Sequence, residues 1–255
     1  MGKIIAIANQ KGGVGKTTTA INLSACLAER RKKVLVIDID PQGNTSSGLG
    51  IDKNAIEYGI YEMIVGDADI KDCIYPTEMK RLKIIPSSIE LSGAEIELYS
   101  MENREFRLKE KLDKVKKDYD YIIIDCPPSL SMLTINALTA AGSVIIPIQC
   151  EYYALEGLTQ IIYTVNLIKE RLNDKLKIEG IVFTMYDSRT NLSEQVVENV
   201  KENLDQRFYD TIIPRNIRLA EAPSFGKPIN LYDSRSTGAM AYRKLAKEVI
   251  KKGGK

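Results

Sequence analysis

The sequence predicts an α/β protein, a single domain built on a doubly wound, mostly parallel sheet flanked by helices. Short runs of mostly β-branched residues lack the alternation of half-exposed strands, which is typical of strands buried on both faces of a parallel sheet. Longer stretches with helical spacing separate these runs, and this alternation predicts right-handed β-α-β units. No linker rich in Pro, Gly or Ser divides the 255 residues, so we expect one domain over 1–255.

The elements follow one another along the chain in a regular order. The apolar runs that predict strands lie at 4–8, 34–39, 82–85, 121–124, 144–148 and 178–183. The stretches that predict helices lie at 17–30, 104–117, 130–140, 154–172 and 192–206. A modest apolar face over 239–250 is best explained by core packing against the sheet, and the tail at 251–255 is predicted to fray. Ligands of such sheets bind at the carboxyl ends of the strands.

Composition excludes several kinds of chemistry. The chain has no histidine, which removes the usual general base and the commonest metal ligand. The four cysteines are widely spaced without a C-x-x-C pair, so we expect buried free thiols. No apolar run approaches the ~20 residues that span a bilayer, and the first run is too short for a signal peptide. We therefore expect a cytoplasmic protein.

A Gly-rich loop joins the first predicted strand to the first predicted helix, which is the context that a phosphate-binding P-loop requires. Glycines let backbone N–H groups converge on phosphate oxygens, and the helix N-terminus adds partial positive charge. Lys16 is expected to reach the β- and γ-phosphates of ATP, and the Thr17 hydroxyl to bind Mg²⁺. The predicted nucleotide-binding residues of the loop are Lys11, Gly12, Gly13, Val14, Gly15, Lys16, Thr17 and Thr18.

Acidic residues follow two of the predicted strands. Asp40 comes just after the strand at 34–39, and Asp125 just after the strand at 121–124. A carboxylate at the end of a hydrophobic strand beside a P-loop is typical of a Walker B metal site. We therefore predict that Thr17, Asp40 and Asp125 form the magnesium site, and that Asp38 braces the P-loop.

The P-loop departs from the ordinary G-x-x-x-x-G-K-[ST] pattern because Gln10 stands where the first Gly is expected. Its form, K-G-G-V-G-K-T-T, resembles the deviant Walker A box of the ParA/MinD superfamily. Further segments resemble chromosomal ParA proteins of the Soj type along essentially the whole chain. They are D-I-D-P-Q-G-N, I-I-D-C-P-P-S-L, L-T-I-N-A-L, Q-C-E-Y-Y-A-L-E-G-L and I-P-R-N-I-R-L-A-E-A-P-S-F-G-K-P.

The resemblance implies an ATPase that segregates chromosomes or plasmids. MgATP would drive a homodimer that sandwiches the nucleotide, in which Lys11 reaches the partner's phosphates. The catalytic residues would be Lys11, Lys16 and Asp40, with Asp40 orienting the attacking water and Asp125 holding Mg²⁺ mostly through water. The dimer would bind double-stranded DNA of any sequence on the nucleoid. A ParB-like, Spo0J-type centromere-binding partner would stimulate slow hydrolysis and release the dimer.

A basic C-terminal region fits that implication. Residues 211–255 carry ten Lys/Arg and three Asp/Glu, which indicates a surface that faces a polyanion. The resemblance places DNA-contacting arginines at Arg189 and Arg218, and we add Lys201, Lys227 and Lys247 as further DNA-binding candidates. The loop after a late strand would reach the adenine, so Pro214, Arg215 and Asn216 complete the predicted nucleotide site.

Three other functions share this fold class. A MinD-like membrane switch that positions cell division needs a C-terminal amphipathic helix with large apolar residues, and the face at 239–250 is modest. An iron-sulfur carrier needs cluster thiolates, whereas Cys126 directly follows Asp125. A small-molecule kinase or ligase needs an acceptor site, and no motif marks one. Retention on duplex DNA with ATP would separate the partition function from all three.

Overall fold

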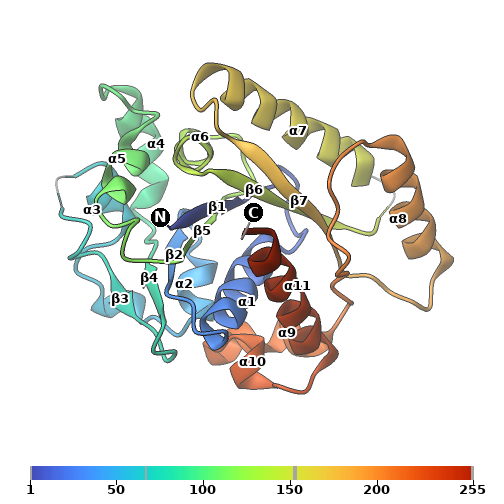
Figure 1. Cartoon of the computed structure of the whole chain (residues 1–255). Coiled ribbons are helices and arrows are strands. Elements are labelled where there is room, and N and C mark those ends of the chain that lie inside the picture. The colour runs from blue at the N-terminus through green and yellow to red at the C-terminus, as the bar shows by residue number, and fades with distance from the viewer. Residues whose placement is uncertain (1, 67, 152–153, 254–255) are drawn as a thin grey trace.

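The computed structural model describes residues 2–66, 68–151 and 154–253, with only the backbone for 252 and 253. In these residues seven strands form one sheet in the order β3-β4-β2-β5-β1-β6-β7 (Figure 1). All pairings are parallel except that of β3 with β4. The strands are β1 (Lys3–Ile7), β2 (Val34–Asp38), β3 (Tyr75–Pro76), β4 (Leu82–Ile85), β5 (Tyr121–Asp125), β6 (Ser143–Gln149) and β7 (Lys177–Thr184).

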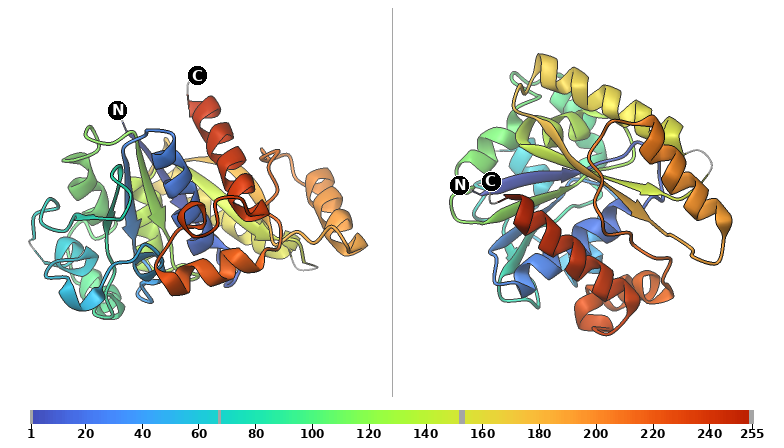
Figure 2. Two further views of the ribbon diagram at one scale, coloured as in Figure 1. Left: turned by 90° about the horizontal axis from the view of Figure 1, so that it is seen from below. Right: turned by 45° about the vertical axis from the view of Figure 1, so that its right-hand side comes forward.

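Helices cover both faces of the sheet, which confirms the predicted doubly wound fold. They are α1 (Lys16–Glu29), α2 (Asn44–Gly48), α3 (Ile60–Ile64), α4 (Leu91–Tyr99), α5 (Arg107–Asp113), α6 (Met132–Ala140), α7 (Ala154–Arg171), α8 (Asn191–Asn203), α9 (Ile217–Glu221), α10 (Ile229–Tyr232) and α11 (Thr237–Gly253), with short 3-10 helices η1 (Lys53–Ala55) and η2 (Ala222–Phe225). Figure 2 shows α7 on one side of the sheet and α1 with α11 on the other. Each layer has its own hydrophobic core.

The six predicted strands all form, because each is dominated by apolar residues that are mostly buried; Lys83 of β4 is an exposed exception. The prediction missed β3, which has only two residues, and the helices α2, α3, α4, α9 and α10. The helix predicted over 104–117 is shorter, since α5 covers Arg107–Asp113 only. All four cysteines are free and buried, as expected.

The last helix is part of the core. Leu245 and Val249 are fully buried in the cluster that also contains Leu23 and Leu27 of α1, and Tyr242 Oη lies 3.2 Å from Thr19 Oγ1 of the same helix. The prediction that this apolar face packs inside the protein is therefore confirmed. Helix α11 continues through residue 253 and so takes in much of the tail for which fraying is predicted, while 254 and 255 lie outside the described residues.

A segment of irregular chain runs along the free side of β7. It follows α8 and makes parallel bridges from Phe208 to Ile181 and from Pro214 to Tyr186. Backbone hydrogen bonds from Tyr209 N to Ile181 O (2.9 Å) and from Arg215 N to Tyr186 O (2.9 Å) hold it there. This segment delivers the chain to the carboxyl end of β7, next to the P-loop.

Candidate nucleotide-binding site

The P-loop connects β1 to α1. In the sheet β1 lies between β5 and β6, so the loop stands at the point where the strands β2 to β5 lie on one side of β1 and the strands β6 and β7 on the other. Gly13 (φ 75°) and Gly15 (φ 88°) adopt left-handed backbone conformations that residues with a β-carbon rarely adopt. A β-carbon placed on Gly12 or Gly13 would meet no atom within 4 Å, so open space lies beside this part of the loop. The loop and the N-terminus of α1 are thus shaped to bind phosphate oxygens.

Contacts to the neighbouring strands hold the loop in place. Asn9 Nδ2 donates to Pro147 O of β6 at 2.9 Å, and Asn9 Oδ1 accepts from Lys11 N at 3.0 Å. Thr184 Oγ1, at the end of β7, donates to Val14 O at 2.8 Å. Sequence analysis did not single out Asn9 or Thr184, because neither belongs to a motif whose chemistry points to the loop. The loop is therefore positioned before any ligand arrives.

The two lysines of the loop have opposite surroundings. Lys16 is buried, and its Nζ donates to Lys11 O at 3.0 Å across the loop. Burial lowers the pKa of Lys16, while the negative charge of Asp125 acts in the other direction. The Lys11 side chain is 36% exposed, and its only ion pair among the described residues is a 3.4 Å contact from Nζ to Glu151 Oε2. The same loop thus holds one cation inside the site and presents the other at its rim.

Two carboxylates end neighbouring strands behind the loop. Asp38 of β2 and Asp125 of β5 are register partners, and both are fully buried. Asp125 Oδ2 accepts hydrogen bonds from Thr17 Oγ1 (2.8 Å) and Thr45 Oγ1 (2.7 Å). Burial and then the charge of Asp38 raise the pKa of Asp125, and the bonds from Thr45 and Thr17 oppose this. The predicted proximity of Thr17 and Asp125 is therefore present.

Asp38 has a different role from the one expected. Its Oδ2 accepts from Ser46 N and Ser46 Oγ, both at 2.7 Å, and its Oδ1 accepts a long bond of 3.4 Å from Asp40 N. The prediction that Asp38 braces the P-loop is wrong for the described residues, because its hydrogen bonds come from Ser46 of α2 and from Asp40 N, and none comes from the P-loop. Burial raises the pKa of Asp38.

Asp40 lies on the loop between β2 and α2. Its Oδ1 accepts from Gln42 N at 3.0 Å, its backbone O accepts from Gly43 N at 2.8 Å, and it is mostly buried. Its charge is among those that raise the pKa of Lys16, which places its carboxylate within electrostatic reach of the P-loop. Thr45 and Ser46, which follow this loop, were missed by the sequence analysis. Their position shortly after D-P-Q-G-N was the available signal.

The oxygen atoms around the P-loop suit a magnesium ion that also binds water and phosphate, and do not suit a metal ion held by protein side chains alone. Among the described residues no group of three or more His, Cys, Asp or Glu side chains is arranged to hold a metal ion. Asp125 Oδ1 is buried and has no hydrogen-bond partner among the described residues, while Oδ2 of the same carboxylate accepts from the Thr17 hydroxyl. Mg²⁺ commonly keeps several waters and binds one or two protein oxygens together with phosphates. The adjacent oxygens of Thr17 and Asp125 fit that pattern, and Asp40 lies on the loop after the neighbouring strand β2.

A cavity of about 370 Å³ opens beside the loop and receives the residues predicted to bind the adenine. Gly15 and Thr18 form one wall, and Pro214, Arg215 and Asn216 belong to the other. The remaining lining residues are mostly apolar: Thr184, Met185, Ile213, Ile217, Leu219, Ala220 and Tyr242. A mostly apolar cavity with a few polar groups beside a phosphate-binding loop is the shape that a base and ribose require.

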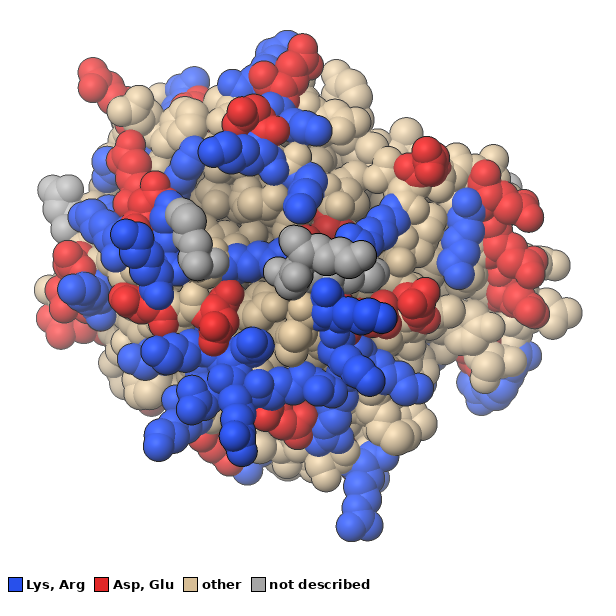
Figure 3. All heavy atoms as spheres, in the orientation of Figure 1, with Lys and Arg blue, Asp and Glu red and all other residues tan. Residues whose placement is uncertain are grey.

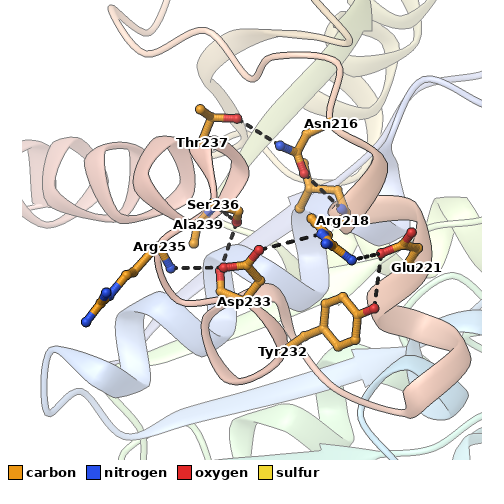
Figure 4. A network of polar contacts seen from close by, with 10 residues as sticks. Asn216, Arg218, Glu221, Tyr232, Asp233, Arg235, Ser236, Thr237 and Ala239 are labelled. Atoms are coloured by element: carbon orange, nitrogen blue, oxygen red, sulfur yellow. Dashed lines mark hydrogen bonds and ion pairs between the residues drawn. The ribbon is translucent and has the colours of Figure 1, made fainter.

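The cavity wall leads directly into the helix that carries Arg218. Asn216 is the N-cap of α9, since its Oδ1 accepts from Leu219 N at 3.2 Å, and its Nδ2 donates to Thr237 Oγ1 at 2.8 Å (Figure 4). Arg218 Nη1 donates to Glu221 Oε2 at 2.8 Å, and its Nε lies 3.7 Å from Asp233 Oδ2. A residue that lines the cavity therefore fixes the start of α9.

The other DNA-binding candidates lie at separate places on the surface. The Arg189 side chain is 84% exposed and makes a bidentate pair with Asp187, which holds the pKa of that carboxyl well below its usual range. Lys227 lies 3.7 Å from Glu78, and Lys201 lies over the Phe183 ring. Lys247 lines a groove along α11. Each of these residues thus has its own local surroundings on the single chain.

Comparison with known proteins agrees with this geometry. The family model described as "AAA domain" matches residues 2–178. The chain is 61% identical to the sporulation initiation inhibitor protein Soj of Bacillus subtilis (strain 168), over 99% of this chain and 100% of that protein. It is 51% identical to the chromosome-partitioning ATPase Soj of Treponema pallidum (strain Nichols), over 100% and 99% respectively.

A solved structure shares the fold almost completely. Cobyrinic acid a,c-diamide synthase of Mycobacterium smegmatis, with bound ADP and magnesium, superposes with a TM-score of 0.88 at 37% identity, over 98% of this chain and 95% of that one. Its name belongs to the class of small-molecule ligases considered above. Relatives at 51% to 54% identity are named as chromosome-partitioning proteins, and they favour the partition class over the ligase class.

Proposed function

Because this chain belongs to the ParA/Soj family of chromosome-partitioning ATPases, we propose that MgATP switches it between a free monomer and a dimer that binds DNA of any sequence. In this proposal Lys16 and the loop from Lys11 to Thr18 hold the phosphates, and the cavity beside Pro214, Arg215 and Asn216 holds the base. Thr17, Asp40 and Asp125 hold magnesium, whose charge supplies electrostatic stabilisation of the phosphates when it is bound.

The observation that carries the proposal is the contrast between Lys11 and Lys16. A cation that serves the phosphates of its own subunit should lie inside the loop, as Lys16 does. Lys11 instead stands at the exposed rim, weakly paired with Glu151, where it can reach a second molecule that faces the loop. A cation supplied in trans makes dimer formation depend on the γ-phosphate, in the way that an arginine finger does.

Asp40 is the residue that we propose to support ATP hydrolysis. Its carboxylate lies on the loop after β2, near the P-loop but outside the buried pair formed by Asp38 and Asp125. A carboxylate at that place can orient the attacking water and accept its proton. We propose that a ParB-like centromere-binding partner raises this slow hydrolysis and so releases the dimer from DNA.

The link from the cavity to Arg218 supports nucleotide control of DNA binding. Asn216 lines the cavity and caps α9, so a nucleotide that repositions this residue also repositions the Arg218 side chain two residues later. Arg218 and Arg189 each hold carboxylates in the single chain. Two subunits joined through their nucleotide sites would double the number of cationic contacts, and phosphate contacts of this kind carry no base readout.

The decisive experiment is co-sedimentation or gel shift on random duplex DNA with ATP, ADP and no nucleotide. We expect the protein to be retained on DNA only when ATP is present. In the cell we expect the ATP-bound protein to lie on the nucleoid, in the cytoplasm. A membrane switch is the competing function. No described helix is long and apolar enough to cross a membrane, and the apolar face of α11 is occupied by α1. ATP-dependent binding to anionic liposomes without DNA binding would replace the partition mechanism with that one.

A further inference from the structure

Five cationic side chains surround a hollow at the amino ends of the strands, whereas the P-loop lies at their carboxyl ends. They come from separate segments that meet where β4, β2 and β5 begin. The five residues are Lys33, Lys71, Lys80, Arg81 and Lys83. The hollow measures about 500 Å³, and Ile74, Val115 and Tyr119 form its less polar lining, with Asp118 as its one acidic member. We call it the amino-edge hollow.

None of the five cationic groups makes an ion pair or a side-chain hydrogen bond with another described residue. All five side chains are exposed. The acidic side chains nearby leave them free: Asp120 Oδ2 accepts from the backbone N of Lys33, not from its ammonium group. Like charges held this close repel one another, which destabilises the folded chain.

A second basic hollow nearby shows the contrast. It measures about 440 Å³ and is also lined by lysines. There Lys3 pairs with Glu179 at 2.5 Å and Lys116 pairs with Asp113 at 2.6 Å. Its charges are thus partly neutralised within the protein, whereas those of the amino-edge hollow are not. Figure 3 shows Lys and Arg side chains gathered over the lower left of the face that carries the start of β1.

We propose that the amino-edge hollow binds a small ligand that carries two or more phosphates and an apolar or planar part. Several converging cations match the clustered negative charges of a polyphosphate, and the Tyr119 ring with Ile74 and Val115 gives a surface for the rest of the ligand. The hollow is too small to admit a duplex, and the five-residue strands separate it from the P-loop by roughly 15 Å. This site is independent of the proposed ATP site.

The test uses inorganic triphosphate as the probe, titrated by calorimetry in the Lys16→Ala variant so that the P-loop contributes little. We expect saturable binding that weakens as salt rises. The double variant Lys33→Gln with Lys83→Gln should bind at least tenfold more weakly. The matched control is Lys175→Gln with Lys177→Gln in the second hollow, which should bind as before. Both pairs are exposed and lack ion pairs among the described residues, so neither change should prevent folding.

Thermal unfolding gives a second readout that needs no nucleotide. Neutralising Lys33 and Lys83 should raise the melting temperature at low salt, because repulsion between the cations is relieved. Triphosphate should raise the melting temperature of the protein with an unsubstituted hollow but not that of the double variant. Absence of saturable binding, or equal loss in both double variants, would overturn the proposal. Binding of a 12-base-pair duplex through Lys33 and Lys83 without triphosphate binding would also overturn it, in favour of a nucleic-acid surface.

Discussion

Asp38 and Asp125 end two neighbouring strands in register, and both carboxylates are completely buried. Burial and then the charge of Asp38 raise the pKa of Asp125, burial raises that of Asp38, and no ion pair with a described residue relieves either carboxylate. Buried like charges are unfavourable unless hydroxyls, amides or a metal ion compensate. Thr17, Thr45 and Ser46 supply part of the compensation, and a magnesium ion near Asp125 would supply more. We therefore expect a cation bound beside Asp125 to stabilise the site.

Lys16→Ala should weaken MgATP binding roughly 100-fold. A charge-assisted contact to phosphate is lost, which costs about 3 kcal/mol where water is excluded. Equilibrium binding of a fluorescent ATP analogue measures the effect, and the fold is checked by circular dichroism. Unchanged affinity in a folded variant would show that the phosphates bind elsewhere.

Lys11→Ala should bind ATP nearly as well as the unsubstituted chain but remain monomeric. The reason is that Lys11 lies at the exposed rim and is proposed to act on the partner's phosphates. Sedimentation velocity with a slowly hydrolysed ATP analogue checks this. The matched control is Glu151→Gln, which removes the acidic partner of Lys11 but keeps the lysine and should still dimerise. An ATP-dependent dimer of the Lys11→Ala variant would remove the role in trans.

Asp40→Ala should bind ATP and dimerise but turn over at least about 100 times more slowly, since general base catalysis contributes on the order of 10²–10⁴. The phosphate cradle is left intact, so the DNA-bound dimer should accumulate. Phosphate release with and without the partner protein measures turnover. Partner-stimulated turnover at the normal rate would contradict the role given to Asp40.

Arg189→Glu or Arg218→Glu should weaken duplex binding at least about tenfold and leave ATP-dependent dimerisation intact, because a charge facing phosphates is reversed in both subunits. The affinity of the unsubstituted chain for DNA should fall steeply as salt rises, because roughly 0.9 counterion is released for each phosphate that the protein neutralises. It should not depend on base sequence. The matched control is Lys175→Glu, which reverses a charge in the second basic hollow, away from the predicted DNA-binding arginines. An equal loss in all three variants would mean that only net charge matters.

Thr45→Val should lower the free energy of unfolding by about 1–3 kcal/mol, because it leaves a buried carboxylate oxygen with one donor fewer. Urea unfolding without nucleotide measures the change. Thr45→Ser keeps the hydroxyl and should restore most of the stability. Equal destabilisation by both substitutions would show that the hydrogen bond to Asp125 is not what stabilises the fold here, because only Thr45→Val removes the hydroxyl.

Sequence alone predicted the parts of this protein that repeat a local rule. Each long strand is a continuous apolar run, and Lys16 and Thr17 belong to a loop whose spacing encodes its chemistry. The short elements escaped prediction because packing creates them: β3 has two residues, and α2 is held by Ser46 bonding to Asp38. The misplaced role of Asp38 has the same origin. Its strand position was readable, but its partners come from a helix that no periodicity indicated.

The chain segment that covers β7 has a consequence for assembly. One edge of the sheet is occupied by Phe208 and Pro214 with their neighbours, and the other is the two-residue strand β3, which contains Pro76. Within the described residues, neither edge offers a row of free backbone groups that another chain could extend. A protein that dimerises and gathers on DNA, as we propose for this one, would otherwise risk growing into cross-β aggregates. Any larger array of these molecules must therefore be built from side-chain contacts and nucleotide, which hydrolysis can reverse.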